Sequence, residues 1–266
     1  MTEGVAVTES AQASNGSDAL EVEFDVVARW TLDAVRQLGE DHAVPAGCRG
    51  SASPAALAWL GEACELGSDR VLLDVGGGVG GPSAYAAERF GVRPVLVEPM
   101  IGAVRAAAAL FGIPAIVGAG ERLPLATGSI PAAWCLGVLC TTQQKAAVLG
   151  ELHRVLAPGA PLGLLVFLAD EPEPAGAPEG NQFPTAGELD RLLAEAGFDV
   201  VEQAELADFA DAPLSWTERA DRVEQAVEQA HAGDPRLAVA RDQERRIGRL
   251  LADGRVTGRL VHAVTR

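Results

Sequence analysis

The sequence has few basic residues. Its 266 residues include 21 Lys and Arg against 37 Asp and Glu, which gives a formal net charge of −16 at pH 7. Binding to nucleic acid or to an anionic membrane requires a basic footprint, and none offsets this excess of acids. We therefore expect neither nucleic acid nor a membrane as a partner. A run of about 18 apolar residues is also missing, so a transmembrane helix is not expected.

Cysteine and histidine are scarce, with four of each. No C-x-x-C pair or histidine cluster is present, so no metal site is expected and the thiols are expected to be reduced. Residues 1–18 lack the basic start and apolar stretch of a signal peptide and are expected to be a flexible tail. A cytoplasmic location is the resulting expectation. Hydrophobic residues reach 48%, enough to bury a core, which excludes wholesale disorder.

Short apolar runs alternate with helical segments along most of the chain. The predicted strands are 70–75, 93–99, 114–118, 130–138, 161–169, 198–206 and 258–266. The predicted helices are 20–38, 54–66, 80–90, 101–111, 143–159 and 185–198, followed by two amphipathic helices between 213 and 252. This alternation predicts an α/β fold with a parallel sheet that is covered on both faces.

The densest local signal is VLLDVGGGVGGP at 71–82, a strand that leads through a glycine loop into a helix. Glycines let the backbone approach a ligand closely, and the helix start offers unpaired N–H groups. In an open parallel sheet, ligands bind beyond the carboxyl ends of the strands. Gly76, Gly78 and Gly81 satisfy the dinucleotide fingerprint G-x-G-x-x-G. A glycine turn that only tightens the packing of strand and helix is the simpler alternative.

Two acids separate the possible ligand classes. Asp74 lies two residues before the first glycine, where its carboxylate disfavours a pyrophosphate. The same carboxylate suits a cationic ligand such as S-adenosylmethionine, which carries a sulfonium and an ammonium group. Glu98 ends the next strand, where one carboxylate can bind both hydroxyls of a ribose. A solvated acid at a strand end is the alternative interpretation of Glu98.

With these segments, the sequence resembles the class I S-adenosylmethionine-dependent methyltransferases over about residues 47–205. The resemblance rests, in chain order, on LLDVGGGVGG, VLVEPM, GAGERLPLATGSIPAAWCLGVL and LHRVLAPGAPLGLLVF. The sequence looks most like the small-molecule branch that includes ubiquinone/menaquinone-type and natural-product enzymes. The resemblance implies a Rossmann-like, seven-stranded methyltransferase sheet with N-terminal helices and a helical lid, and S-adenosylmethionine as cofactor.

The implied organisation has four parts. After the flexible tail, residues 19–68 form N-terminal helices that cover the active site. Residues 69–206 and 254–266 form the Rossmann-like core that binds the cofactor. Residues 207–253 form a helical lid inserted before the last strand.

The resemblance assigns a first group of cofactor contacts. Asp74, Gly76 and Gly78 match the motif that lies against the methionine and ribose portions. Glu98 matches the acid that binds the ribose. Met100 is expected beside the adenine face, where a polarizable side chain packs well.

A second group comes from the loops after the third and fourth strands. Gly120 and Glu121 match the loop at the adenine edge. Cys135 and Leu136 end the fourth strand, whose carbonyls receive the methionine ammonium in the family. The sequence departs from the family at Ala119, where an acid often contacts the adenine amino group. Backbone groups or Glu121 would have to replace that contact.

The remaining candidates concern the methyl acceptor. His42 is the candidate for a catalytic base, because it precedes the GCRG loop near the expected cofactor mouth. Arg49, Cys140, Phe183 and Trp216 are the candidates for the substrate pocket. Methyl transfer needs a base only when the nucleophile must lose a proton, so the reaction does not depend on His42.

The expected function is transfer of a methyl group to an O, N or C nucleophile of a small molecule, such as a secondary metabolite. One alternative is a non-methylating cyclase, or another natural-product enzyme, that binds S-adenosylmethionine in the same fold. Another is a binding module without catalysis. The expected oligomeric state is a monomer or homodimer.

Overall fold

The computed structural model describes residues 19, 20 and 22–266, so the predicted tail at 1–18 lies outside the described residues. The strands are β1 (Val71–Val75), β2 (Arg93–Glu98), β3 (Ala115–Val117), β4 (Ala133–Leu136), β5 (Pro161–Ala169), β6 (Phe198–Glu205) and β7 (Val256–Thr265). The α-helices are α2 (Val27–Leu38), α3 (Ala43–Gly47), α4 (Pro54–Ala63), α5 (Gly81–Phe90), α6 (Ile101–Phe111), α7 (Lys145–Val155), α8 (Ala186–Glu195), α9 (Leu214–His231) and α10 (Pro235–Ala252). Three shorter turns are the π-helix η1 (Val22–Val26) and the 3₁₀ helices η2 (Glu40–His42) and η3 (Leu206–Phe209).

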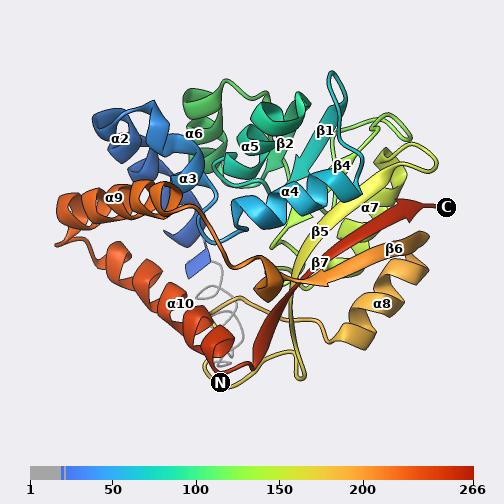
Figure 1. Ribbon diagram of the computed structural model, residues 1–266. Helices are drawn as coiled ribbons and strands as arrows, with labels where there is room; N and C mark the ends of the chain where they lie inside the picture. Colours follow the sequence, from blue (N-terminus) through green and yellow to red (C-terminus); the bar gives the residue numbers. More distant parts are fainter. Residues whose placement is uncertain (1–18, 21) are drawn as a thin grey trace, which may run out of the picture.

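The strands of the described region form one seven-stranded sheet in the order β3-β2-β1-β4-β5-β7-β6 (Figure 1). The strands from β3 to β5 are parallel to their neighbours. The prediction of a parallel sheet was wrong for β7, which is antiparallel to both β5 and β6. The helical insertion leaves the chain at the same end of the sheet where β6 finishes, so β7 runs back in the other direction.

The two faces of the sheet bury separate sets of side chains, because successive residues of a strand point to opposite faces. On one face, Leu73 packs with Leu149 of α7 and Leu189 of α8. On the other face, Leu72 packs with Leu57 of α4. These layers confirm the predicted Rossmann-like sheet covered on both faces. No helix in the described ranges is long and apolar enough to cross a membrane.

Most predicted elements are present, with shifted boundaries. Ser53 and Thr185 accept hydrogen bonds from the N–H groups three residues later and so begin α4 and α8. The fourth strand is shorter than predicted, since Ile130 forms only a single bridge with Leu156. Residues 40–47, for which the sequence analysis predicts no helix or strand, form η2 and α3.

The two helices inserted between β6 and β7 pack against the N-terminal helices. In Figure 1, α9 lies beside α2 and α3, and α10 leads from the end of α9 back to β7. Val223 and Val227 of α9 are buried in one cluster with Trp30 and Ala34 of α2. The helical insertion and the N-terminal helices therefore form one packed unit.

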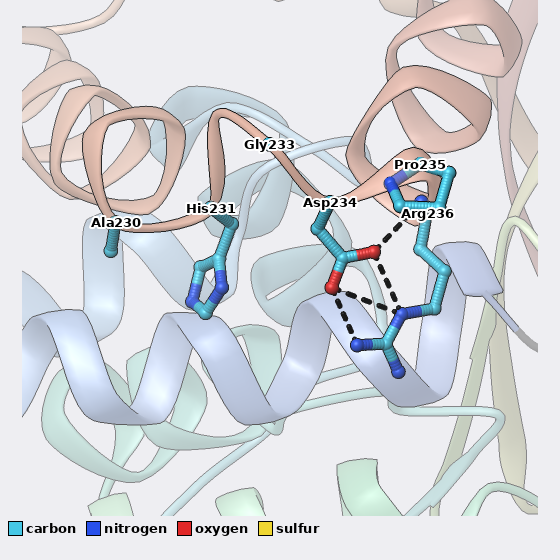
Figure 2. Close-up of a pocket in the computed structure, with 6 residues that line it drawn as sticks. All are labelled: Ala230, His231, Gly233, Asp234, Pro235 and Arg236. Carbon is cyan, nitrogen blue, oxygen red and sulfur yellow. Dashed lines mark hydrogen bonds and ion pairs between the residues drawn. The ribbon is translucent and has the colours of Figure 1, made fainter.

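The turn between α9 and α10 is held to α2 through Trp30. Its indole stacks on the His231 ring, with centroids 4.2 Å apart and the planes 17° apart. The Arg236 guanidinium carbon lies 5.5 Å from the centroid of the same indole. Figure 2 shows His231 pointing out of the turn and Asp234 bonded to Arg236, whose hydrogen bond holds the pKa of Asp234 at about 2.

We expect His231→Ala to lower the free energy of unfolding by about 1 kcal/mol, because the variant loses the ring stacking on Trp30. Urea denaturation measures this loss. Arg191→Ala is the control, since its exposed pair with Glu195 on α8 should contribute at most about 0.5 kcal/mol. Equal stability of both variants and the unmodified protein would show that the stacking does not stabilise the turn.

Candidate functional site

The glycine loop follows the carboxyl end of β1, between β2 and β4. The N–H of Gly76 donates to the Val97 carbonyl at 2.7 Å, which holds the start of the loop against β2. Gly76 and Gly78 have φ values of +70° and +55°, which side chains other than glycine rarely adopt. A Cβ on Gly77 would lie 2.6 Å from Asp74 Oδ2, whereas one on Gly78 would meet no atom within 4 Å. The loop therefore wraps Asp74 tightly and is open at Gly78.

Asp74 is a buried carboxylate at the base of this loop, with 1% of its surface exposed. The Ser83 hydroxyl donates to Oδ2 at 2.7 Å, and Oδ1 is buried with no hydrogen-bond partner among the described residues. Burial raises the pKa of Asp74 to about 6, against the lowering effect of the Ser83 hydrogen bond. An unpartnered buried carboxylate oxygen is costly, and a cationic ligand would compensate it.

Glu98 ends β2 beside the loop. Its Oε2 accepts from the Gly78 N–H at 3.1 Å and its Oε1 accepts from the Met100 N–H at 3.0 Å. Burial raises the pKa of Glu98, while these two N–H donors lower it. Glu98 also raises the pKa of Asp74 through charge repulsion, so the two acids act on the same small region. The structure thus brings together Asp74, Gly78, Glu98 and Met100 as the sequence predicts.

The loops after β3 and β4 meet through a side-chain hydrogen bond. The Thr142 hydroxyl donates to Glu121 Oε1 at 2.9 Å. A Cβ on Gly120 would lie 3.2 Å from Val75 at the end of β1, which places Gly120 next to the glycine loop. Ala119 is exposed, and its carbonyl accepts from the Arg122 N–H. Glu121 is therefore positioned by Thr142, and contact with an adenine stays a prediction.

Cys135 and Leu136 are buried at the end of β4. Cys135 pairs in register with Leu164 of β5, and burial raises the pKa of its thiol well above the usual range. The thiol is thus neutral, which leaves the backbone of this strand end as the group able to contact a ligand.

An apolar cluster lies beyond the ends of β4 and β5. Cys140 and Phe183 are both buried in it, together with Leu250 of α10. The Cys140 carbonyl accepts from the Gln182 N–H at 2.7 Å, so the loop at 170–184 is held against the loop after β4. The structure thus brings together two of the four predicted pocket residues.

The loop at 170–184 is also tied to α10. The amide of Gln243 accepts from the Glu179 N–H at 3.1 Å and donates to the Glu179 carbonyl at 3.0 Å. The Arg255 guanidinium donates to the Ala175 carbonyl at 2.8 Å. The apolar cluster is therefore closed from outside by α10 and this loop acting together.

The structure separates the other two predicted pocket residues from this cluster. Trp216, near the start of α9, packs edge-on against Tyr85 of α5, with ring centroids 6.1 Å apart. Arg49 forms ion pairs with Glu224 of α9 and Glu244 of α10. The guanidinium of Arg49 is thus directed to the inserted helices, and contact with a substrate stays a prediction.

His42 ends η2, immediately before α3. Its Nδ1 lies 3.3 Å from the Gly39 carbonyl, and within the described part of the chain its buried Nε2 has no hydrogen-bond partner. Its neighbour Asp41 faces Arg219 of α9 at 3.9 Å. This places His42 where the N-terminal helices meet α9, and its role as a base stays a prediction. Among the described residues, no group of three or more His, Cys, Asp or Glu side chains could hold a metal ion.

Three features of the site were missed by the sequence reasoning. Ser83, which orients Asp74, lies one helical turn after the glycine loop, and a hydroxyl at that position is a usable signal. The close packing of α3 on the start of α5 requires Gly47 and Gly81, and nothing in the sequence pairs these two glycines. Asp25 bonds the N–H of Gly102 across 77 positions, which no local pattern indicates.

The region that contains the glycine loop and the ends of β1, β2 and β4 is similar to known methyltransferases. Residues 73–164 match the family model of the methyltransferase domain. A curated relative, 24-methylenesterol C-methyltransferase 2 of Oryza sativa subsp. japonica, is 30% identical over 159 residues, covering 51% of this chain and 43% of the relative. The chain thus spans less than half the length of that relative.

Solved structures share the fold over a larger part of the chain. The [4+2]-cyclase SpnF has a TM-score of 0.65 at 20% identity, with 80% of each chain covered. Geranyl diphosphate C-methyltransferase from Streptomyces coelicolor A3(2), solved with Mg²⁺, geranyl diphosphate and S-adenosyl-L-homocysteine, has a TM-score of 0.59 at 17% identity. That match covers 80% of this chain and 77% of the other.

Proposed function

Because this chain belongs to the class I S-adenosylmethionine-dependent methyltransferases, we propose that it transfers a methyl group from S-adenosylmethionine to a small molecule. The acceptor atom is an O, N or C nucleophile, and the acceptor is a secondary metabolite. The observation that carries the proposal is Asp74, a buried carboxylate with an unpartnered oxygen beside an open glycine loop. Membership of the ubiquinone/menaquinone-type branch stays a prediction.

The residues at the loop fit this cofactor chemically. Asp74 supplies the negative charge that a ligand with ammonium and sulfonium groups requires, and its free Oδ1 is an acceptor for such a group. Glu98 presents a carboxylate that is already oriented by two N–H groups, which suits it to accept from ribose hydroxyls. Three further residues would then border the adenine ring of the cofactor, namely Met100, Gly120 and Glu121.

When bound, S-adenosylmethionine supplies an electrophilic methyl group on a sulfonium. The chain contributes binding, orientation and the exclusion of water. Orientation of two reactants in one site accounts for up to roughly 7–11 kcal/mol of a lowered barrier. The buried cluster around Cys140 and Phe183 keeps water from the strand ends where the acceptor binds. His42 takes a proton only for acceptors that must lose one.

The side chains packed beside the ends of β4 and β5 favour an acceptor that is largely apolar. Cys140, Phe183 and Leu250 form a buried apolar cluster there, and the Cys140 thiol donates to the Gly137 carbonyl at 3.1 Å. The relative acts on a sterol and one structural neighbour on geranyl diphosphate, according to their names. Residues 19–68 and 207–253 act as the cover of this site.

We propose in addition that the protein works without nucleic acid or membrane, in the cytoplasm, as a monomer or homodimer. The excess of acidic residues supports the proposal that the protein does not bind nucleic acid. That no described helix is long and apolar enough to span a membrane agrees with a protein that works without a membrane.

A non-methylating reaction in the same fold is the second candidate. The observation that favours it is the likeness to a [4+2]-cyclase over 80% of the chain. Mass spectrometry of the products separates the two candidates. Methyl transfer adds one methyl group to the acceptor and converts the cofactor to S-adenosylhomocysteine, whereas a cyclase leaves both masses unchanged.

We expect one molecule of S-adenosylhomocysteine to bind per chain, because its amino acid and ribose groups are recognised by Asp74 and Glu98. Isothermal titration calorimetry measures this binding, and NAD⁺ is the control ligand for the dinucleotide alternative. Lack of binding at millimolar S-adenosylhomocysteine would contradict the proposed function. Tighter binding of NAD⁺ would favour the dinucleotide interpretation of the glycine loop instead.

A further inference from the structure

Asp25 of η1 is bonded to the start of α6, although 77 positions separate the two residues in the sequence. Its carboxylate accepts a hydrogen bond from the Gly102 N–H. The N-cap residue of α6 is Met100, which makes no capping hydrogen bond with its side chain. A carboxylate from another element therefore supplies the cap and interacts favourably with the helix dipole. Arg29, one turn along, pairs with the same carboxylate at 3.0 Å.

The contact is built from both sides. A Cβ on Gly102 would lie 2.6 Å from the Asp25 carbonyl oxygen and 2.7 Å from its Oδ1. Only glycine at this position lets η1 approach α6 so closely. The turn that carries Asp25 is a π-helix, a conformation that is rare and often marks functional positions.

The segment held by Asp25 borders the elements that form the candidate cofactor site. Ala28 packs with Ala103 of α6, and Val79 and Met100 pack against the same cluster. Val79 belongs to the glycine loop, and Met100 follows Glu98. Burial raises the pKa of Glu98, and the charge of Asp25 adds to the effect. The start of the N-terminal unit thus closes the corner between the glycine loop and the end of β2.

We propose that Asp25 is a positioning residue that holds η1 and α2 over this corner and slows the release of the bound cofactor. The inference rests on the proposed function. A ligand at the corner leaves only when the N-terminal segment opens, and opening breaks the hydrogen bond between Asp25 and Gly102. Loss of one charged hydrogen bond corresponds to about a tenfold larger open fraction.

The test measures dissociation of S-adenosylhomocysteine by stopped-flow displacement in the full chain. Asp25→Ala and Gly102→Ala should each raise the dissociation rate about tenfold, and the association rate should rise with it because the ligand enters and leaves through the same opening. Asp25→Asn keeps an acceptor and should give an intermediate rate. Asp33→Ala is the matched control, because Asp33 lies on the same N-terminal unit and its ion pair with Arg36 is exposed.

Hydrogen exchange of the ligand-free variants checks that the effect is local. We expect faster exchange of residues 22–32 and of the first turn of α6, with β5 and β7 unchanged. An unchanged dissociation rate in Asp25→Ala, with binding retained, would overturn this inference alone. Failure of the unmodified protein to bind S-adenosylhomocysteine would overturn the proposed function and this inference together.

Discussion

Replacing Asp74 with asparagine should weaken the binding of S-adenosylmethionine about 100-fold and stabilise the cofactor-free protein at the same time. The binding loss follows from removal of the negative charge that faces a cationic ligand, since hydrogen bonds to charged groups contribute about 1.5–3 kcal/mol. Asparagine keeps an oxygen for the Ser83 hydroxyl, so the loop geometry should be retained. Calorimetry at pH 8 measures the affinity.

The gain in stability follows from the raised pKa of Asp74. Burial raises this pKa from 3.8 to about 6, so the folded protein holds the proton at pH values where the unfolded chain has released it. Stability of the unmodified protein should therefore fall by roughly 3 kcal/mol as the pH rises from about 4 to 6 and then level off. Asparagine has no carboxyl proton to release, so the free energy of unfolding of the variant should not fall in this way. Urea denaturation at pH 4, 6 and 8 measures the difference.

Asp69→Asn is the control for both measurements. Asp69 is exposed just before β1, and its φ of +65° is one that asparagine tolerates well. We expect this variant to bind S-adenosylmethionine as tightly as the unmodified protein and to show the same dependence of stability on pH. An Asp74→Asn variant with unchanged affinity would mean that this carboxylate does not face the cofactor.

The second large effect is expected for Gly81→Ala. Gly81 begins α5, and a Cβ there would overlap the backbone of Gly47 and Cys48 at the end of α3. Because backbone atoms cannot move aside as a side chain can, α3 must separate from the glycine loop. We expect the free energy of unfolding to fall by about 3 kcal/mol, the upper end of typical overpacking effects, and cofactor affinity to fall with it. Thermal denaturation and calorimetry measure the two losses.

The same substitution at Gly150 provides the control. Gly150 is exposed on α7, and a Cβ there would meet no atom within 4 Å. Gly150→Ala should stabilise the protein by up to about 1 kcal/mol, because alanine is the better helix former. If Gly81→Ala were as stable as Gly150→Ala, the close packing of α3 on α5 would be disproved.

The sheet was predictable because its strands are continuous apolar runs with turn signals between them. The runs at Val71–Val75 and Pro161–Ala169 lie within the predicted ranges. The direction of β7 was not predictable, because it depends on where a long helical insertion leaves the chain. α3 was missed because a five-residue helix carries too few residues for a periodic pattern.

The candidate site was predictable where one local segment builds it. Asp74 and Glu98 lie at the ends of adjacent strands, so their proximity follows from the order of the elements. Arg49 and Trp216 could not be placed in this way, because their partners Glu224 and Tyr85 come from distant elements. The same is true of Asp25, whose contact with Gly102 depends on how the N-terminal helices pack as a unit.

Hydrogen exchange of the full chain with and without S-adenosylhomocysteine tests the central claim most directly, because it locates the ligand. The account predicts slower exchange in the ligand-bound protein at residues 74–81, at 98–102 and in the loop at 119–122. It predicts no change in α8, which packs against α7 and against β6 at the edge of the sheet opposite β3. Binding accompanied by protection elsewhere, with the glycine loop unaffected, would contradict it.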